Sequence, residues 1–145
     1  MAPPSVRAIA VDVGRVRVGV AVADELGLVA HPRPFVDGRD PRKAVEALAA
    51  LARDEHIDRF LVGLPRTLKG EEGPSARRAR RFAEALAKKT GFPVELVDEW
   101  LSTREAKTRL REAGRDEREQ RELVDSASAA VVLQAWLDAR RTGGS

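Results

Sequence analysis

Acidic residues stand at three places in the chain where a lone buried carboxylate would be costly. Asp12 lies near the end of an apolar, β-branched run, Asp98 and Glu99 follow the last predicted strand, and Asp125 opens the apolar stripe of the last predicted helix. A carboxylate in such a place needs hydrogen-bond donors, a cation or a metal. Three or four clustered carboxylates repel one another unless a cation is present, and oxygen ligands alone favour Mg²⁺ or Mn²⁺. The pattern is typical of metal-assisted phosphodiester hydrolysis.

Taken one at a time, these acids have simpler interpretations, which stay open at this point. Asp12 precedes Gly14 and could cap the turn through its own backbone. Asp125 could be a helix-start charge, worth a few tenths to about 1 kcal/mol. The metal hypothesis therefore depends on elements that bring the acids together.

Five strands are predicted. Two apolar runs, 7–13 and 18–23, flank a short segment with Gly14 and two arginines and predict adjacent strands joined by a tight connection. The segment 28–36 predicts a broken third strand, which its prolines confine to an edge or a bend. The runs 59–63 and 93–97 each follow a helical segment, which is typical of parallel strands.

Four helices are predicted between and after these strands. One begins at Pro41 behind the N-cap Asp40, one is capped by Ser75 and runs to about Thr90, and the others span 102–114 and about 123–140. The charged stretch 115–122 predicts a mobile connection or an exposed helical turn. With right-handed crossovers, this order of elements can bring the three acidic positions to one edge of a sheet.

The charge pattern is compatible with a nucleic-acid partner. The 145 residues include 26 Lys and Arg against 23 Asp and Glu, for a net charge of +3 and a pI of about 9.8. Arg77, Arg78, Arg80 and Arg81 crowd the start of a predicted helix, where they oppose the helix dipole. A phosphate backbone is the natural partner of such a cluster, whereas a solvated helix face and a genomic bias toward arginine are the plain alternatives.

Composition bounds the class of protein. The length and the 43% hydrophobic residues predict a single domain over 1–145, with an ordered core of about 6–140. There is no cysteine, which removes disulfides and thiolate metal sites and is compatible with a reducing cytoplasm. No apolar run of membrane-spanning length and no secretory signal are present, so we expect a cytoplasmic protein without a membrane partner.

Four segments carry a family resemblance, and they are Asp12-Val13-Gly14, Val62-Gly63-Leu64-Pro65, Asp98-Glu99 and Val124-Asp125-Ser126-Ala127. In their order and spacing, from about residue 6 to residue 138, they resemble the YqgF/RuvX family. The resemblance implies an α/β, RNase H-like fold: a mixed five-stranded sheet flanked by helices, with the first three strands antiparallel and two further strands parallel to the first. Members are described as candidate Holliday junction resolvases and as nucleases that mature the 5′ end of the 16S ribosomal RNA precursor.

The resemblance also implies roles for individual residues. Asp12, Glu99 and Asp125 would be the catalytic, metal-binding acids, with Asp98 a weaker fourth ligand, and the metal would be Mg²⁺ or Mn²⁺. The substrate groove would be lined by the loop from Gly63 to Gly73 and by these residues in particular: Arg17, Gly63, Pro65, Gly70, Thr103, Arg77 and Arg81. Trp100 and Lys69 depart from the family pattern, so contacts to the substrate can differ here. Trp100 could stack on an unpaired base or pack against the protein.

Several functions stay open at this stage. The expected partner is structured RNA, pre-16S rRNA, with the ribosome as a further candidate. A four-way DNA junction is the alternative substrate, and its two symmetric cuts would favour a homodimer over a monomer. A module that binds RNA without cutting it, and a small relative of the actin-like ATPases, which share the Asp-x-Gly hairpin, are alternatives of other classes. The ATPase fold needs a much longer chain for its two-domain cleft.

Overall fold

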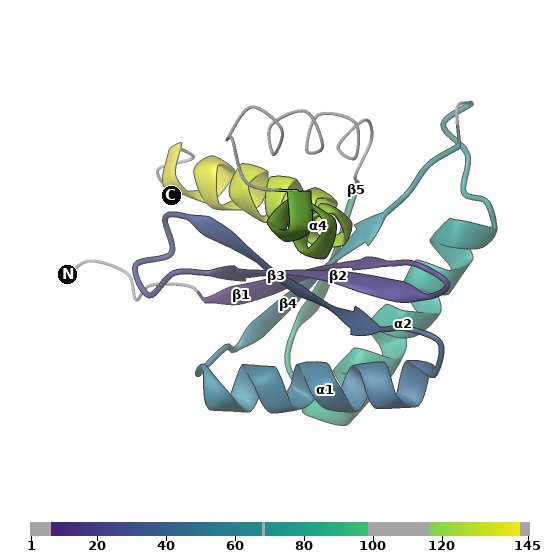
Figure 1. The fold of residues 1–145 in the computed structure, drawn as a ribbon, viewed down its shortest axis with the longest axis horizontal. Coiled ribbons are helices and arrows are strands. Elements are labelled where there is room, and N and C mark those ends of the chain that lie inside the picture. Colours follow the sequence, from purple (N-terminus) through teal and green to yellow (C-terminus); the bar gives the residue numbers. More distant parts are fainter. Residues whose placement is uncertain (1–6, 68, 99–116, 143–145) are drawn as a thin grey trace.

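The computed structural model describes residues 7–67, 69–98 and 117–142, with side chains from 126 to 140 in the last segment. Its elements along the chain are β1 (Ala8–Val13), β2 (Arg17–Ala23), β3 (Ala30–Asp37), α1 (Pro41–Asp54), β4 (Arg59–Leu64), α2 (Pro74–Thr90), β5 (Val94–Asp98) and α4 (Glu117–Thr142) (Figure 1). No helix within these ranges is long and apolar enough to cross a membrane.

The five strands form one mixed sheet in the order β3-β2-β1-β4-β5. β1 pairs antiparallel with β2, and β2 pairs antiparallel with β3, whereas β4 is parallel to both β1 and β5. The predicted mixed five-stranded sheet is therefore confirmed. The proline-containing β3 lies at an edge, as predicted, because proline cannot donate to a second neighbouring strand. It is one continuous strand, and its pairing with β2 carries a bulge between Val18 and Val20.

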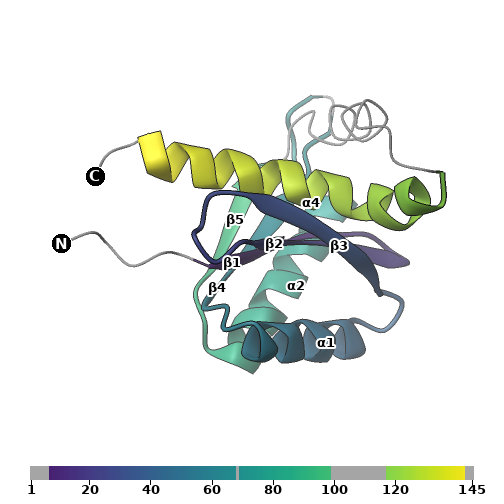
Figure 2. The ribbon, with the colours of Figure 1, turned by 60° about the vertical axis from the view of Figure 1, so that its left-hand side comes forward.

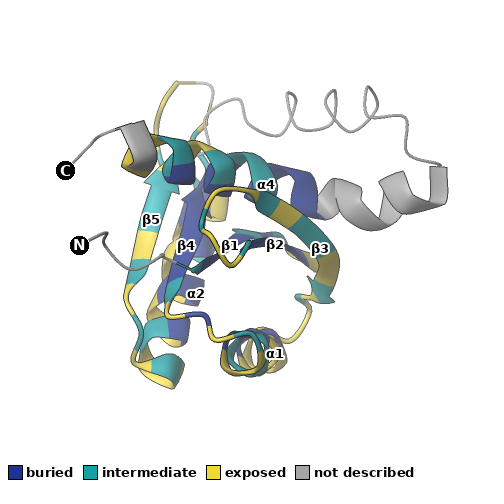
Figure 3. Ribbon diagram, turned by 90° about the vertical axis from the view of Figure 1, so that its left-hand side faces the viewer, coloured by how far each residue is buried: buried dark blue, intermediate teal, exposed yellow. Residues whose placement is uncertain are grey.

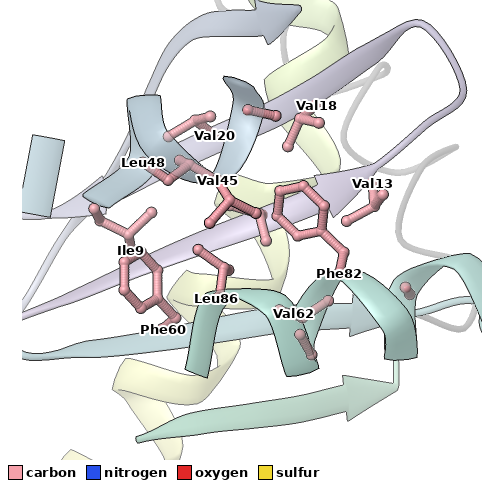
Figure 4. Close-up of a cluster of buried hydrophobic side chains, with 14 of the residues drawn as sticks. Ile9, Val13, Val18, Val20, Val45, Leu48, Phe60, Val62, Phe82 and Leu86 are labelled. Carbon is pink, nitrogen blue, oxygen red and sulfur yellow. The ribbon is translucent and has the colours of Figure 1, made fainter. Parts of the chain in front are cut away.

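Helices cover both faces of the sheet (Figures 1 and 2). α1 and α2 pack on one face over the larger core, which includes Ile9, Leu48, Phe60 and Leu86 (Figure 4). Among the described helices, α4 is the one that packs on the other face, and the burial pattern of Figure 3 shows its sheet-facing side as buried. We call these the α1/α2 face and the α4 face.

The alternation of side chains along β1 explains the two faces. Ile9, Val11 and Val13 point to the α1/α2 face, and the small residues Ala8 and Ala10 lie under α4. The α4 face is lined by small residues on β2 and on α4 as well, so the helix can approach the sheet closely. By the same alternation, Asp12 belongs to the α4 face.

Two predicted helix starts are wrong. Pro74 is the first residue of α2 and Gly73 is its N-cap, so Ser75 lies inside the first turn. The fixed φ of proline suits the first helical position, and it moves the start one residue ahead of the serine. α4 begins at Glu117 and not near residue 123, so it includes most of the charged stretch predicted as a mobile connection or an exposed helical turn, because Glu, Arg, Gln and Leu are good helix formers. α1 begins as predicted, with the Asp40 side chain accepting from the Arg42 N–H. The predicted helix 102–114 lies outside the described residues.

Candidate active site

Asp12 lies near the carboxyl end of β1, the central strand of the sheet. It is half-buried, and its partner across the β1–β2 pair is Gly19. Because strand residues alternate, Asp12 shares the α4 face with Ala8 and Ala10. One carboxylate of the predicted metal site therefore lies at the end of the central strand, as the metal hypothesis requires.

The hairpin that follows Asp12 is held by close backbone contacts. The Gly14 N–H donates to the Arg17 carbonyl at 3.0 Å, and the Gly38 N–H donates to the Val16 carbonyl at 2.7 Å. A Cβ at Gly14 would lie 2.7 Å from the Arg17 carbonyl oxygen, closer than a real Cβ approaches. Glycine is therefore required here by space, and the backbone of Arg17 is fixed next to the strand that carries Asp12.

Ser126 fastens α4 to the sheet. Its Oγ accepts from the Val20 N–H at 2.9 Å and donates to the Arg33 carbonyl at 2.5 Å. These two backbone groups lie at the bulge, where β2 and β3 leave their regular pairing, and the serine hydroxyl takes the place of the missing ladder contacts. The sequence reasoning missed this residue; a serine within an otherwise apolar helix face is the signal that marks it.

The contact made by Ser126 brings Asp125 toward Asp12. Val20 follows Gly19, which is the cross-strand partner of Asp12, and Asp125 precedes Ser126 in α4. The backbone of α4 thus carries Asp125 to the same face and the same part of the sheet as Asp12. The structure describes the Asp125 backbone but not its side chain.

Asp98 ends β5 and does not lie beside Asp12. β4 and β5 pair Gly63 with Val97 and Leu64 with Asp98. Since Leu64 packs in the core of the α1/α2 face, strand alternation gives Asp98 to that face, opposite to Asp12. Its carboxylate, in a side chain that is 61% exposed, accepts from the Arg66 Nε at 3.1 Å.

Glu99 lies outside the described residues, as do Trp100 and Thr103. Among the side chains that the structure describes, no three of His, Cys, Asp and Glu lie close enough to hold a metal ion. The part of the predicted acidic cluster that the structure does describe is therefore the position of Asp12 and the backbone position of Asp125.

The glycine-rich loop after β4 is ordered by its own hydrogen bonds. Gly63 is buried in β4, one position beyond the pair Val11–Val62, and Pro65 is half-buried just after the strand. The Thr67 N–H donates to the Glu71 carbonyl and the Gly70 N–H donates to the Thr67 carbonyl, both at 2.8 Å. Gly70 has a φ of 80°, which favours glycine. Lys69, next to it, is exposed.

Arg66 connects this loop to its neighbours. It lies 3.1 Å from Asp98 at the end of β5 and 3.5 Å from Glu72, and Glu72 in turn accepts from Arg80 of α2 at 2.6 Å. The hydrogen bond from Arg80 is the main cause of a lowered pKa of Glu72, and the charges of Arg80 and Arg66 add to it. This chain of alternating charges ties the loop to β5 and α2.

Arg17 opens β2 and shares the parity of Gly19 and Ala21, so it belongs to the face of Asp12. Its guanidinium lies 5.0 Å from the centre of the Phe35 ring on β3, a cation–π contact with a residue that is 38% exposed. The structure thus brings together Asp12, the backbone of Asp125 and Arg17.

The arginines of α2 lie on the other face of the sheet. α2 packs in the core of the α1/α2 face, so Arg77 and Arg81 are not beside Asp12, and their predicted place in the same groove is not what the fold provides. Arg80 is bound by Glu72, and Arg78 and Arg81 line a pocket between α1 and α2. The cluster that the sequence presents as one patch is divided between two sides of one helix.

Comparisons with known proteins agree with this architecture. The chain is 51% identical over 134 residues to a protein of Anaeromyxobacter sp. (strain K), covering 92% of this chain and 98% of that one. It is 42% identical over 139 residues to a protein of Streptomyces coelicolor, covering 95% and 83%. Both relatives bear the name "Putative pre-16S rRNA nuclease".

Solved structures share the fold. The structure of Thermus thermophilus RuvC in complex with a Holliday junction substrate matches with a TM-score of 0.56 at 17% identity, covering 94% of this chain and 96% of that one. A second Thermus thermophilus RuvC structure matches with a TM-score of 0.51 at 16% identity. The expected RNase H-like fold is confirmed. A family model described as "RuvX: Holliday junction resolvase" matches residues 6–139, and the chain therefore belongs to the RuvX family.

Proposed function

We propose that this protein is a metal-dependent nuclease that processes the 5′ end of pre-16S rRNA. Membership of the RuvX family makes the chain a nuclease, a phosphodiester hydrolase. The observation that carries the mechanism is the position of Asp12 on the α4 face, together with the Ser126 contacts that bring the Asp125 backbone to that face.

A divalent metal fits the residues at this place. Asp12 is half-buried beneath α4, and the neighbouring acid contributed by α4 is again a carboxylate, so the donor set is all oxygen. Asp12, Asp125 and Glu99 would hold Mg²⁺ or Mn²⁺. A bound cation would lower the pKa of a water and neutralise charge on the phosphate and the leaving oxygen.

The choice of Glu99 over Asp98 follows from strand alternation. Asp98 belongs to the face opposite Asp12 and is engaged by Arg66. Glu99 keeps the ligand role that the family resemblance implies for it. We therefore leave Asp98 out of the metal site and assign it to the loop-ordering ion pairs.

Arg17 would bind the substrate on the face of Asp12. Its contact with Phe35 holds the guanidinium at the hairpin that follows Asp12, where a planar fork can bind a phosphate. The loop with Gly63, Pro65 and Gly70 would flank the groove from the β4 side, and Thr103 would contribute from the segment after β5. Phe35 offers an exposed ring on which an unpaired base can stack.

The proposed substrate is pre-16S rRNA, either free or on the ribosome, and the proposed compartment is the cytoplasm. The chain would act as a single domain. The names of the relatives favour RNA, whereas the description of the family favours a four-way DNA junction as the second candidate. Two symmetric cuts in a junction call for a two-fold dimer, so a monomer favours RNA.

The test is cleavage of labelled pre-16S RNA and of a synthetic four-way DNA junction side by side, with Mg²⁺, Mn²⁺ or EDTA, and with light scattering for the oligomeric state. We expect metal-dependent cutting of the RNA by a monomer. Cutting of the junction alone, by a dimer, would replace RNA with DNA as the substrate. Tight binding of RNA without cutting under all metal conditions would contradict the nuclease and support a binding module.

A further inference from the structure

A pocket of about 750 Å³ opens between α1 and α2 beside the β1–β2 hairpin. It lies on the α1/α2 face, so the sheet separates it from the face to which Asp12 belongs. Gly14 and Arg15 of the hairpin line its edge, and Gly14 stands two residues after Asp12. The volume is within the range of small-molecule sites. Neither the metal site nor the substrate groove proposed above uses it.

The floor of the pocket is a part of the main core that stays open. Val13, Val45 and Phe82 line it and are 8%, 5% and 5% exposed, whereas Ile9, Leu48, Phe60 and Leu86 of the same core are fully buried. Figure 4 shows Val13 and Phe82 toward one end of this core and Val45 nearer its middle. Ala85 of α2 adds a small side chain to the lining. The floor therefore offers apolar carbon to a flat ring.

The rim of the pocket is strongly basic. Of its sixteen described lining residues, seven are Arg or Lys and one, Glu46, is acidic. Arg39 is bound by Asp37 at 2.6 Å, so the excess charge rests on the other cations. Arg78 and Arg81 lie on the pocket side of α2, and Arg42 faces them from α1. An occupant must carry apolar surface and negative charge together.

We propose that this pocket binds a nucleotide, with the base on the apolar floor and the phosphate at Arg78, Arg81 and Arg42. Arginine binds phosphate through paired N–H groups and stacks on planar rings, which suits both parts of that ligand. A fatty acid would offer one carboxylate to many cations, and inorganic phosphate would leave the floor uncovered. The nucleotide is either free or an unstacked residue of the nucleic-acid substrate, and only the second source rests on the proposed nuclease function.

The first test is titration of the intact protein with adenosine 5′-monophosphate, monitored by amide NMR shifts and calorimetry, with inorganic phosphate as a control ligand. We expect shifts at Val45, Phe82 and Ala85, and weaker binding of phosphate alone. The double variant R78E/R81E should lose about tenfold or more in affinity, since two charged contacts to phosphate are reversed. The matched control K43E/R53E makes the same charge change on exposed positions of α1 outside the lining and should bind as wild type does.

A second variant separates base recognition from charge. Ala85→Leu narrows the pocket with a larger apolar side chain and leaves every charge in place, so it should weaken binding of the nucleotide and not of inorganic phosphate. The proposal would be overturned if R78E/R81E and K43E/R53E lost the same nucleotide affinity. It would also be overturned if the amide shifts were confined to residues away from the pocket. Equal affinity for phosphate and nucleotide would overturn it as well, and so would preference for an acidic peptide.

Cleavage kinetics distinguish the two sources. If the nucleotide belongs to the substrate, R78E/R81E raises KM for the RNA and leaves kcat unchanged. If it is free, nucleotide binding is lost in the variant and KM stays the same. Titration with the mononucleotide does not depend on cleavage, so the nucleotide site can be tested even if the protein proves not to be a nuclease. If the protein cuts RNA but binds no nucleotide in this pocket, only the proposal of a nucleotide site is contradicted.

Discussion

Replacing Ser126 with alanine tests the idea that one hydroxyl positions α4. The Ser126 side chain is fully buried, and its Oγ serves both the Val20 N–H and the Arg33 carbonyl. Alanine leaves both backbone groups without this partner at a place closed to solvent. A buried polar group that loses its partner costs about 1 to 3 kcal/mol. The carbonyl tolerates the loss better than the N–H, because it has a second lone pair.

We therefore expect Ser126→Ala to lower the free energy of unfolding by about 2 to 3 kcal/mol. For a domain of this size, that is a fall in Tm of about 6 to 12 °C. Urea denaturation followed by circular dichroism measures the first quantity, and calorimetry measures the second. RNA cleavage, assayed well below the Tm, should fall too, because α4 carries Asp125 in the adjacent position.

Ser75→Ala is the matched control, with the same chemical change at an exposed position inside the first turn of α2. It should change stability by less than about 0.5 kcal/mol. Equal stabilities of the two variants would refute the reasoning about Ser126. A loss near 1 kcal/mol in Ser75→Ala would instead mean that Ser75 caps the helix.

Three further changes have defined outcomes. Gly14→Ala forces a Cβ against the Arg17 carbonyl and should cost about 1 to 3 kcal/mol in urea denaturation; an unchanged midpoint would mean that the hairpin is not tight. Arg80→Gln should raise the pKa of Glu72 toward its ordinary value in an NMR titration. Because this pKa is lower in the folded state, the ionised Glu72 stabilises the fold at pH values above the ordinary glutamate pKa, and this stabilisation is lost as the pH falls through the lowered pKa. The decline in stability on acidification should therefore be smaller in the variant. Arg17→Gln should reduce the salt slope of RNA binding by about one, and an unchanged slope would remove Arg17 from the phosphate contacts.

Local sequence signals predicted most of the sheet. Apolar β-branched runs mark β1 and β2, and a short apolar run after a helical segment marks β4. Pro32 and Pro34 place β3 at an edge because they remove donors. Asp40 with Pro41 marks the start of α1. The same rule failed at α2, where serine is a common cap but Pro74 and Gly73 together set the start. Several residues near a helix start can each serve as its cap, and the sequence does not show which of them will do so.

The candidate site was harder to predict, because side-chain direction depends on register. Asp98 and Glu99 are neighbours in the sequence, and the family resemblance kept both as ligands, with Asp98 the weaker. The pairing of Leu64 with Asp98 is what assigns Asp98 to the face opposite Asp12. Ser126 acts through a bulge that no local pattern predicts. Arg66 bridges two acids that come from distant parts of the chain, so its role is visible only after folding.

The arginine cluster shows the same limit. Arg77, Arg78, Arg80 and Arg81 form one basic patch in the sequence, yet helical geometry turns Arg80 toward Glu72 and Arg78 and Arg81 toward the pocket. The prediction of a phosphate contact stays a prediction for this pair. Its proposed place has moved from the groove at Asp12 to the α1/α2 face.

The central claim is that Asp12, Glu99 and Asp125 form the metal site and that Asp98 does not. The most direct test is Mg²⁺-dependent cleavage of pre-16S RNA by Asp12→Asn, Glu99→Gln, Asp125→Asn and Asp98→Asn, with melting curves and RNA affinities measured in parallel. We expect the first three to lose about a hundredfold or more in rate with fold and binding intact, and Asp98→Asn to keep cutting. Cleavage by Asp12→Asn at the wild-type rate would contradict the account.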